Sequence, residues 1–274
     1  MSRLSTLLLA LPLFLLAAPA PAAGPIKDPA LEAVIRANLH FANGDLTDEK
    51  LKSVHIVTEG NQKGIKDLSG LEKCTNLKEL RLAKNEITDV KPLAGLVELQ
   101  SLDLSHNKIK DVTPLAGLKA LQYLELSNNE IEKIDPLSGL PALTSLYLTG
   151  NKIADCGPAA KLTKLWSIHL GKNQLKDIGP LAALTKIDTL EISDNQIVDI
   201  APLGKMTELK LVMMSRNKVT DLTPLVKSAE ADAAGPKRFA PYLRLYLGGN
   251  PLSDAAKKDQ IAALKKAGVK VFEE

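Results

Sequence analysis

The stretch that decides the fold runs Leu99-Gln-Ser-Leu-Asp-Leu-Ser-His-Asn107-Lys-Ile-Lys-Asp-Val-Thr-Pro114-Leu115, and its pattern returns every 22 residues. Each return has a Leu-x-x-Leu-x-Leu segment before an asparagine, and in all but the last a proline stands seven places after it. The asparagines are Asn85, Asn107, Asn129, Asn151, Asn173, Asn195, Asn217 and, after a gap of 33, Asn250. A fixed period of roughly 20 to 50 residues is typical of a stacked solenoid, and this spacing predicts leucine-rich repeats.

Each repeat predicts one short strand and one turn. Leu80 and Leu82 flank an outward-facing residue, which is the period-two pattern of a strand with one buried face. The amide of Asn85 is expected to turn inward and bond backbone groups that the turn leaves unpaired. The predicted fold is α/β: a right-handed leucine-rich repeat solenoid with short parallel strands on the concave face, short helical turns on the convex face and helical caps at both ends.

An aspartate precedes the proline turn in most repeats, and we expect it to cap that turn. These residues are Asp67, Asp89, Asp111, Asp155, Asp177, Asp199 and Asp221, with Lys133 in the same place once. Stacked carboxylates would repel one another unless each accepts backbone N–H bonds. A calcium site is the alternative, but the repeats lack the dense Gly and Asp loop of calcium-binding repeats.

The first 23 residues have the composition of a secretory signal peptide. One basic residue, Arg3, precedes an uncharged, largely apolar run from Leu4 to Ala18, and small residues follow up to Ala23. No later stretch is long and apolar enough to cross a bilayer. The sequence therefore predicts a secreted or periplasmic protein with no integral membrane segment after cleavage.

Charge and cysteine content narrow the function further. The formal net charge is only +3 for 274 residues, so neither nucleic acid nor an anionic membrane is expected as a general partner. Cys74 and Cys156 stand where other repeats carry Leu, Val or Ile, nearly four repeats apart, which is too far for a disulfide. We expect two buried, unreactive thiols.

Non-repetitive segments bound the repeats. Asp28 and Thr47 each predict the start of a helix that covers the open end of the first repeat, and Ser253 predicts a helix that ends at Gly268 before a final strand. We expect the insertion that breaks the period to form a longer helix or loop, with or without a function. The predicted domains are a signal peptide at 1–23, a helical N-terminal cap at 24–64, leucine-rich repeats at 65–252 (eight asparagine-bearing rungs, insertion at 226–241) and a C-terminal helix–strand cap at 253–274.

The whole chain after the signal resembles a bacterial leucine-rich repeat protein of the internalin type. The unit Leu-x-x-Leu-x-Leu-x-x-Asn-x-Ile-x-Asp-Val-x-Pro-Leu and the helical opening from Asp28 to Leu51 carry the resemblance. It implies binding of another macromolecule, usually a protein, through the concave sheet. The sequence shows no cell-wall sorting motif, immunoglobulin-like domain or wall-binding repeat, so we do not expect host-cell adhesion.

Aromatic side chains gather in the outward-facing columns of the expected concave sheet. Three of the four tyrosines fall there in a chain that is only 3% aromatic, and the single tryptophan lies at the margin. Aromatic anchors flanked by charges are typical of binding hot spots, although half-buried strand positions also favour aromatics for packing alone. The candidate partner-binding residues are Tyr123, Tyr147, Trp166 and His169, with Asp103, Glu125, Glu191 and Arg81 beside them. Leu211 and Met213 also face outward by register, as a second contact or as a surface covered by the insertion.

An enzymatic function is not expected. Ser145, His169 and Glu191 fall on adjacent repeats and superficially form a Ser–His–acid set. Such a set also needs an oxyanion hole and a pocket that excludes water, which an open sheet does not offer. The sequence carries no phosphate-binding loop, metal-ligand cluster or cofactor motif, so we expect no catalytic residues, no metal and no cofactor.

The sequence thus predicts a monomeric, non-enzymatic binding module that recognises a protein partner of unknown identity. Because the sheet is preformed, little ordering entropy would oppose binding. Glycan or peptidoglycan binding through the same aromatics is the first alternative, and a structural role in the envelope is the second.

Overall fold

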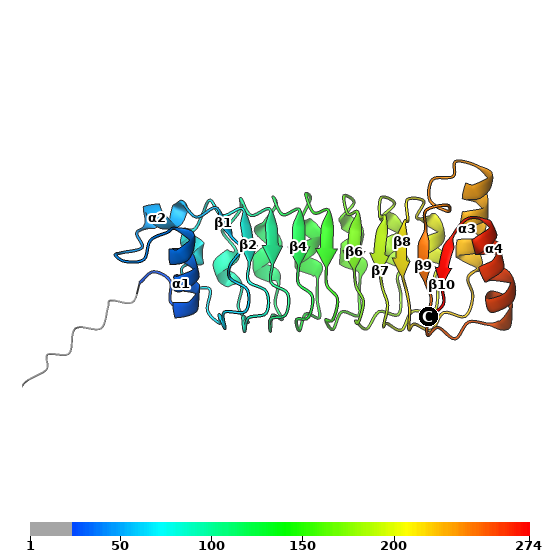
Figure 1. Cartoon of the computed structure of the whole chain (residues 1–274), viewed down its shortest axis with the longest axis horizontal. Helices are drawn as coiled ribbons and strands as arrows, with labels where there is room; N and C mark the ends of the chain where they lie inside the picture. The colour runs from blue at the N-terminus through cyan, green and yellow to red at the C-terminus, as the bar shows by residue number, and fades with distance from the viewer. Residues whose placement is uncertain (1–23) are drawn as a thin grey trace, which may run out of the picture.

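The computed structural model describes residues 24–274, and the expected signal peptide lies outside them. The described residues form one elongated stack in which ten parallel strands pair in chain order, from β1 to β10 (Figure 1). The leucine-rich repeat solenoid is thereby confirmed. Within residues 24–274, no helix has both the length and the apolar character needed to cross a bilayer.

The strands are short and recur with the period of the sequence. Equivalent residues pair across the sheet, so that Leu80 lies beside Leu102 and Leu102 beside Leu124. The sheet has two strands beyond the eight asparagine-bearing rungs, because β1 and β10 extend it at the two ends. The strands are β1 (Ile56–Val57), β2 (Glu79–Arg81), β3 (Ser101–Asp103), β4 (Tyr123–Glu125), β5 (Ser145–Tyr147), β6 (Ser167–His169), β7 (Thr189–Glu191), β8 (Leu211–Met213), β9 (Arg244–Tyr246) and β10 (Lys270–Phe272).

Short 3₁₀ helices lie opposite the sheet. They are η1 (Leu71–Lys73), η2 (Lys91–Leu93), η3 (Thr113–Gly117), η4 (Asp135–Gly139), η5 (Gly157–Lys161), η6 (Gly179–Ala183) and η7 (Ala201–Lys205). Before every one of these helices except η4, where Lys133 takes the place, an aspartate accepts a backbone N–H bond as expected, for example from Lys91 to Asp89 across 2.8 Å. The position differs by one residue from a true N-cap, since Asp89 precedes the capping residue Val90 and Pro92 is the second helical residue. The aspartate forms an Asx turn that leads into the helix.

Leucine and isoleucine fill the interior between the strands and the 3₁₀ helices. The strand residues Leu80 and Leu82 are fully buried, and the same holds along the stack. Cys74 and Cys156 are buried in this core as free thiols, and burial raises the pKa of each to about 12. The prediction of two inert thiols agrees with this environment.

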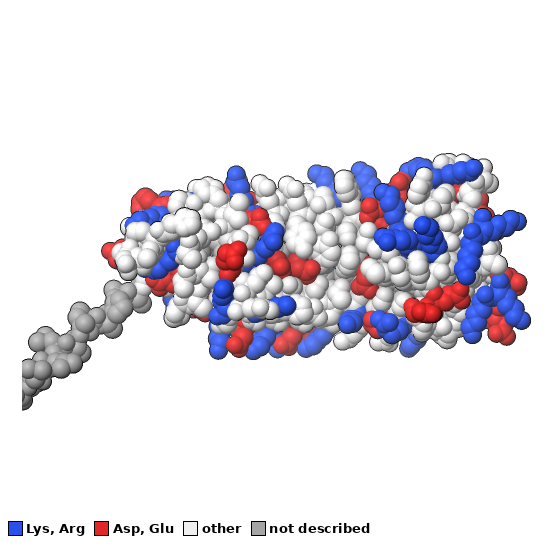
Figure 2. All heavy atoms as spheres, viewed as in Figure 1, with Lys and Arg blue, Asp and Glu red and all other residues white. Residues whose placement is uncertain are grey.

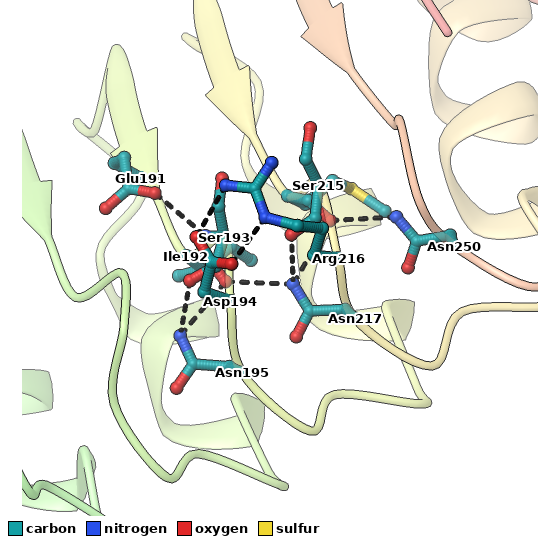
Figure 3. Close-up of polar contacts among 10 residues, drawn as sticks. Glu191, Ile192, Ser193, Asp194, Asn195, Ser215, Arg216, Asn217 and Asn250 are labelled. Carbon is teal, nitrogen blue, oxygen red and sulfur yellow. Dashed lines mark hydrogen bonds and ion pairs between the residues drawn. The ribbon is translucent and has the colours of Figure 1, made fainter. Parts of the chain in front are cut away.

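The recurring asparagines form a ladder beside the core. Asn217, for instance, donates from Nδ2 to the carbonyl of Ile192 in the preceding rung (2.9 Å) and to Met214 in its own rung (3.1 Å), while its Oδ1 accepts from the Ile197 N–H (3.1 Å). In Figure 3, the amide nitrogens of Asn195, Asn217 and Asn250 each bond backbone carbonyl oxygens, and Asp194 and Arg216 pair across two rungs nearby. Each amide therefore joins two rungs through buried backbone groups.

Helices close both ends of the stack. Helix α1 (Pro29–Asn38), capped by Asp28, packs on β1, and α2 (Asp48–Lys52), capped by Thr47, packs on η1. The insertion forms α3 (Thr223–Ala234), which packs on η7 rather than on the sheet. After Ser253, whose Oγ accepts from the Ala256 N–H, the expected single helix contains a π-helical turn, η8 (Ala256–Gln260), before α4 (Ile261–Lys266).

Candidate functional site

The outward surface of the ten-stranded sheet corresponds to the concave surface that the sequence predicts. It is called the sheet face below. Two side chains of each three-residue strand, β2 to β10, point out of it, and strand register aligns them in two columns. The outer column holds Glu79, Ser101, Tyr123, Ser145, Ser167, Thr189, Leu211, Arg244 and Lys270. The middle column holds Arg81, Asp103, Glu125, Tyr147, His169, Glu191, Met213, Tyr246 and Phe272.

Three of the candidate residues are in contact in the centre of this face. The ring centroids of Tyr123 and Tyr147 lie 5.3 Å apart, and those of Tyr147 and His169 lie 4.6 Å apart. Burial, together with the nearby Glu125 carboxylate, raises the pKa of Tyr123 to about 12, and burial lowers the pKa of His169. Figure 2 shows the surface over β5 and β6 largely free of charged side chains. The three rings form a half-buried, uncharged cluster.

A second aromatic pair lies farther toward the C-terminus, separated from the ring cluster by Glu191 of β7. The rings of Tyr246 and Phe272 stack with centroids 4.4 Å apart and planes 10° apart, and Met213 is the strand neighbour of Tyr246. The insertion does not cover Met213, because α3 packs on η7 and α4. The sequence did not predict that Phe272 lies in the middle column, because β10 lies outside the repeat period. The six residues Tyr123, Tyr147, His169, Met213, Tyr246 and Phe272 are called the aromatic row below.

The carboxylates beside the row are bonded within the protein. Asp103 accepts from the Ser105 N–H (2.9 Å), Glu125 from Ser127 (2.7 Å) and Glu191 from Ser193 (2.9 Å). Burial raises the pKa of Glu125 even though the Ser127 N–H stabilises its ionised form. The sequence predicted these residues as charged flanks, and the structure places them there with their oxygens engaged by the turn that follows each strand.

Arg81 lies at the N-terminal limit of the face. Its guanidinium pairs with Glu79 across 2.7 Å. Together with Ser101, Asp103 and Tyr123, it lines a shallow cavity of about 270 Å³. Arg81 therefore borders the aromatic row without belonging to the ring cluster.

Trp166 lies at the margin of the two columns, as the sequence indicated, but its ring is separate from the cluster of Tyr123, Tyr147 and His169. It directly precedes β6 and is 62% exposed. It lines a separate hollow of about 540 Å³ together with Lys186, Asp188, Lys210 and Arg238, among others. Because Trp166 precedes the strand, its side chain lies beside the two columns and not within them.

The structure gives no support to a catalytic set. Among residues 24–274, no hydrogen bond links Ser145 to His169 or His169 to Glu191, and the Glu191 carboxylate bonds backbone N–H groups instead. The same residues contain no cluster of His, Cys, Asp or Glu arranged to hold a metal ion.

Comparisons with known proteins agree with this architecture. A family model described as leucine-rich repeats (2 copies) matches residues 75–117, 97–139 and 119–161. The chain is similar to the crystal structure of an internalin (inlF) from Listeria monocytogenes, with 32% identity and a TM-score of 0.73, over 94% of this chain and 78% of that one. Internalin C2 from the same organism is 28% identical, with a TM-score of 0.64, over 91% of this chain and 95% of that chain.

A leucine-rich repeat protein from Leptospira interrogans shares the fold at 23% identity, with a TM-score of 0.59 over 85% of this chain and 55% of that chain. No curated protein sequence matches the chain. The 22-residue unit, the ten-stranded parallel sheet and the similarity to inlF together show that the chain belongs to the internalin-type family of bacterial leucine-rich repeat proteins.

Proposed function

We propose that this chain is a non-enzymatic, secreted or periplasmic module that binds a protein partner through the aromatic row of its sheet face. A leucine-rich repeat fold of the internalin type supports a protein-interaction module in general. The observation that carries the specific proposal is the row itself, in which aromatic and methionine side chains remain accessible on six of the ten strands.

A partner that covers the row would remove exposed apolar surface from water. Tyr123 is 37% exposed and Phe272 is 40% exposed, so each still presents apolar surface to water. Burial of such surface contributes about 25 cal/mol per Å², and aromatic anchors near the centre of an interface contribute most of the binding energy. The row therefore supplies the apolar core that a protein interface needs.

The carboxylates beside the row are already hydrogen-bonded, which lowers the free-energy cost of burying them. Asp103, Glu125 and Glu191 already accept hydrogen bonds from backbone N–H groups, so a partner need not supply donors for all of their oxygens. Each strand from β2 to β9 is bonded to two neighbours, and the end strands β1 and β10 are each bonded to one, so the face is ordered before the partner arrives. Little conformational entropy is then lost on association. We propose that the module binds as a monomer.

Affinity capture tests this proposal. Residues 24–274 serve as bait for an envelope extract of the source organism, beside the double variant Tyr147→Ala/Tyr246→Ala. The matched control is Val97→Ala/Val198→Ala, which removes two exposed apolar side chains outside the sheet face (55% and 56% exposed). A protein retained by the wild type and the control, but lost from the Tyr147/Tyr246 variant, supports the proposal. Equal retention by all three baits contradicts it.

A further inference from the structure

We propose a second binding site, independent of the aromatic row, for an acidic glycan, meaning a chain of sugars that carries carboxylate groups. The site is the hollow of about 540 Å³ beside Trp166. Trp166, Asp188 and Lys210 directly precede β6, β7 and β8, so the hollow follows the edge at which the chain enters these strands. Its volume falls within the ~300–1,000 Å³ typical of ligand sites.

Trp166 is the one aromatic residue that lines this hollow. It is the single tryptophan of the chain and is 62% exposed. The sheet fixes its backbone, because the Trp166 carbonyl accepts from the N–H groups of Asp188 (3.0 Å) and Thr189 (3.1 Å). All other lining residues are Thr, Lys, Asp, Glu or Arg. A flat ring among polar groups suits a sugar, whose C–H face stacks on an aromatic ring while its hydroxyls bond the surroundings.

The charges of the hollow favour an anionic ligand. Three cations, Lys186, Lys210 and Arg238, face two carboxylates, Asp188 and Glu208. Lys210 pairs with Asp188 across 3.8 Å and Arg238 pairs with Glu208, whereas Lys186 has no ion-pair partner within residues 24–274. Figure 2 shows Lys and Arg atoms gathered over β7–β9 on this side of the molecule. A ligand carboxylate would satisfy the excess positive charge.

The insertion contributes to this site through Arg238. Asp232, near the C-terminal end of α3, accepts from the N–H groups of Arg238 (2.8 Å), Phe239 (3.1 Å) and Ala240 (2.9 Å). Burial opposes ionisation of Asp232, but these three bonds outweigh it and lower the pKa of the carboxyl. The insertion is thus held in a loop that places Arg238 at the hollow. This gives the break in the repeat period a function.

The mixture of charges separates a glycan from an acidic peptide. Sugar hydroxyls donate hydrogen bonds, so Asp188 and Glu208 are useful acceptors for a glycan. For a peptide rich in Asp and Glu, the same two carboxylates are repulsive and few donors meet them. Trp166 adds stacking that a poly-acidic peptide does not use.

Fluorescence of the single tryptophan reports directly on this site. We would titrate the purified protein with hexagalacturonate, with neutral cellohexaose and with hexaglutamate. The proposal expects a saturable change with hexagalacturonate that is at least about 10-fold weaker for each of the other two ligands, the effect of one charge-assisted contact. No saturable change with hexagalacturonate overturns the site. Equal affinity for cellohexaose or hexaglutamate overturns the acidic-glycan assignment.

Substitutions then locate the binding. Lys186→Gln and Arg238→Gln should each weaken hexagalacturonate binding about 10-fold, whereas Lys84→Gln, an exposed lysine outside the hollow, should leave it unchanged. Lys186 is exposed and unpaired within the described chain, so its replacement should leave thermal unfolding unchanged. Unaltered hexagalacturonate affinity in both Gln variants would contradict the proposal. Tyr147→Ala/Tyr246→Ala should bind the glycan normally, which separates this site from the aromatic row.

Discussion

The carboxylate of Glu191 accepts a hydrogen bond across 2.8 Å from the backbone N–H of Gly171, a residue of the preceding rung. In the rungs of Asp103 and Glu125, the strand's own carboxylate bonds the equivalent N–H two residues later. The rung of Gly171 carries His169 in that place, so Glu191 reaches back while still accepting from Ser193. A Cβ on Gly171 would collide with the Glu191 carboxylate. The turn that follows β6 is thus bonded by a carboxylate from the next strand.

Gly171→Ala is therefore expected to destabilise the protein by about 1–3 kcal/mol. The new methyl group displaces Glu191 and leaves the buried N–H of residue 171 without an acceptor. Chemical denaturation followed by circular dichroism measures the loss. Because both substitutions break the same contact, Gly171→Ala/Glu191→Ala should cost less than the two single changes added together. Full additivity in this cycle would contradict the coupling.

Asn151→Ala is expected to cost about 3 kcal/mol or more. Asn151 is 7% exposed, and its amide bonds the Ile131 N–H (3.0 Å) and the carbonyls of Leu126 (3.0 Å) and Leu148 (2.9 Å). Alanine leaves these buried groups unpaired, at about 1–3 kcal/mol each. The matched control is Asn250→Ala in the last rung, where the side chain is only partly buried and water can replace it. Equal losses in denaturant unfolding would argue against a buried ladder.

His169 is expected to titrate below its ordinary pKa of 6.5, because burial in the ring cluster disfavours the imidazolium more than Glu191 favours it. The unfolded chain then binds the proton more tightly than the folded chain. Stability from this residue is therefore fully present above pH 6.5 and is lost as pH falls from 6.5 through the folded pKa. NMR titration of the imidazole measures the midpoint. His169→Asn should remove this part of the pH dependence of unfolding, and a His169 midpoint at or above 6.5 would exclude the proposed environment.

Cys74 and Cys156 are expected to resist alkylation in the folded protein. Both are buried, and the pKa of each thiol is raised to about 12, so little thiolate is present at mildly alkaline pH. Mass spectrometry after iodoacetamide treatment should show no adduct on the native protein and two adducts after denaturation. An adduct on the native protein at either cysteine would show that its rung opens.

The regular part of the fold could be predicted because each of its features repeats. The period predicted that Leu80 and Leu82 are buried, that the asparagines face the backbone and that each aspartate accepts a bond from a backbone N–H. Strand β10 could not be located in the columns, because a helix of different length precedes it and the period gives it no register. The π-helical turn after Ala255 likewise has no repeated counterpart that would indicate it.

Those residues of the candidate site that lie in the two strand columns could be predicted from the sequence. The period placed Tyr123, Tyr147 and His169 on adjacent strands, and the structure brings their rings together. It placed Trp166 at the margin of the columns but did not show that this side chain lines a separate hollow. The contact between Glu191 and Gly171 was also missed, because it joins two rungs through a non-repeating glycine. The position of Arg238 could not be predicted either, because this residue belongs to the insertion and the insertion does not follow the repeat period.

The most direct test of the central claim compares two tyrosines near the same strand. Tyr246 lies in the aromatic row, whereas Tyr242 is 62% exposed and precedes β9 outside it. Isothermal titration calorimetry would measure the affinity of the captured partner for Tyr246→Ala, Tyr246→Phe and Tyr242→Ala, each checked for unchanged thermal unfolding. Binding through the aromatic row predicts a loss of about 10-fold or more for Tyr246→Ala, near-complete retention for Tyr246→Phe and no change for Tyr242→Ala. Wild-type affinity in Tyr246→Ala, or a loss confined to Tyr242→Ala, would contradict it.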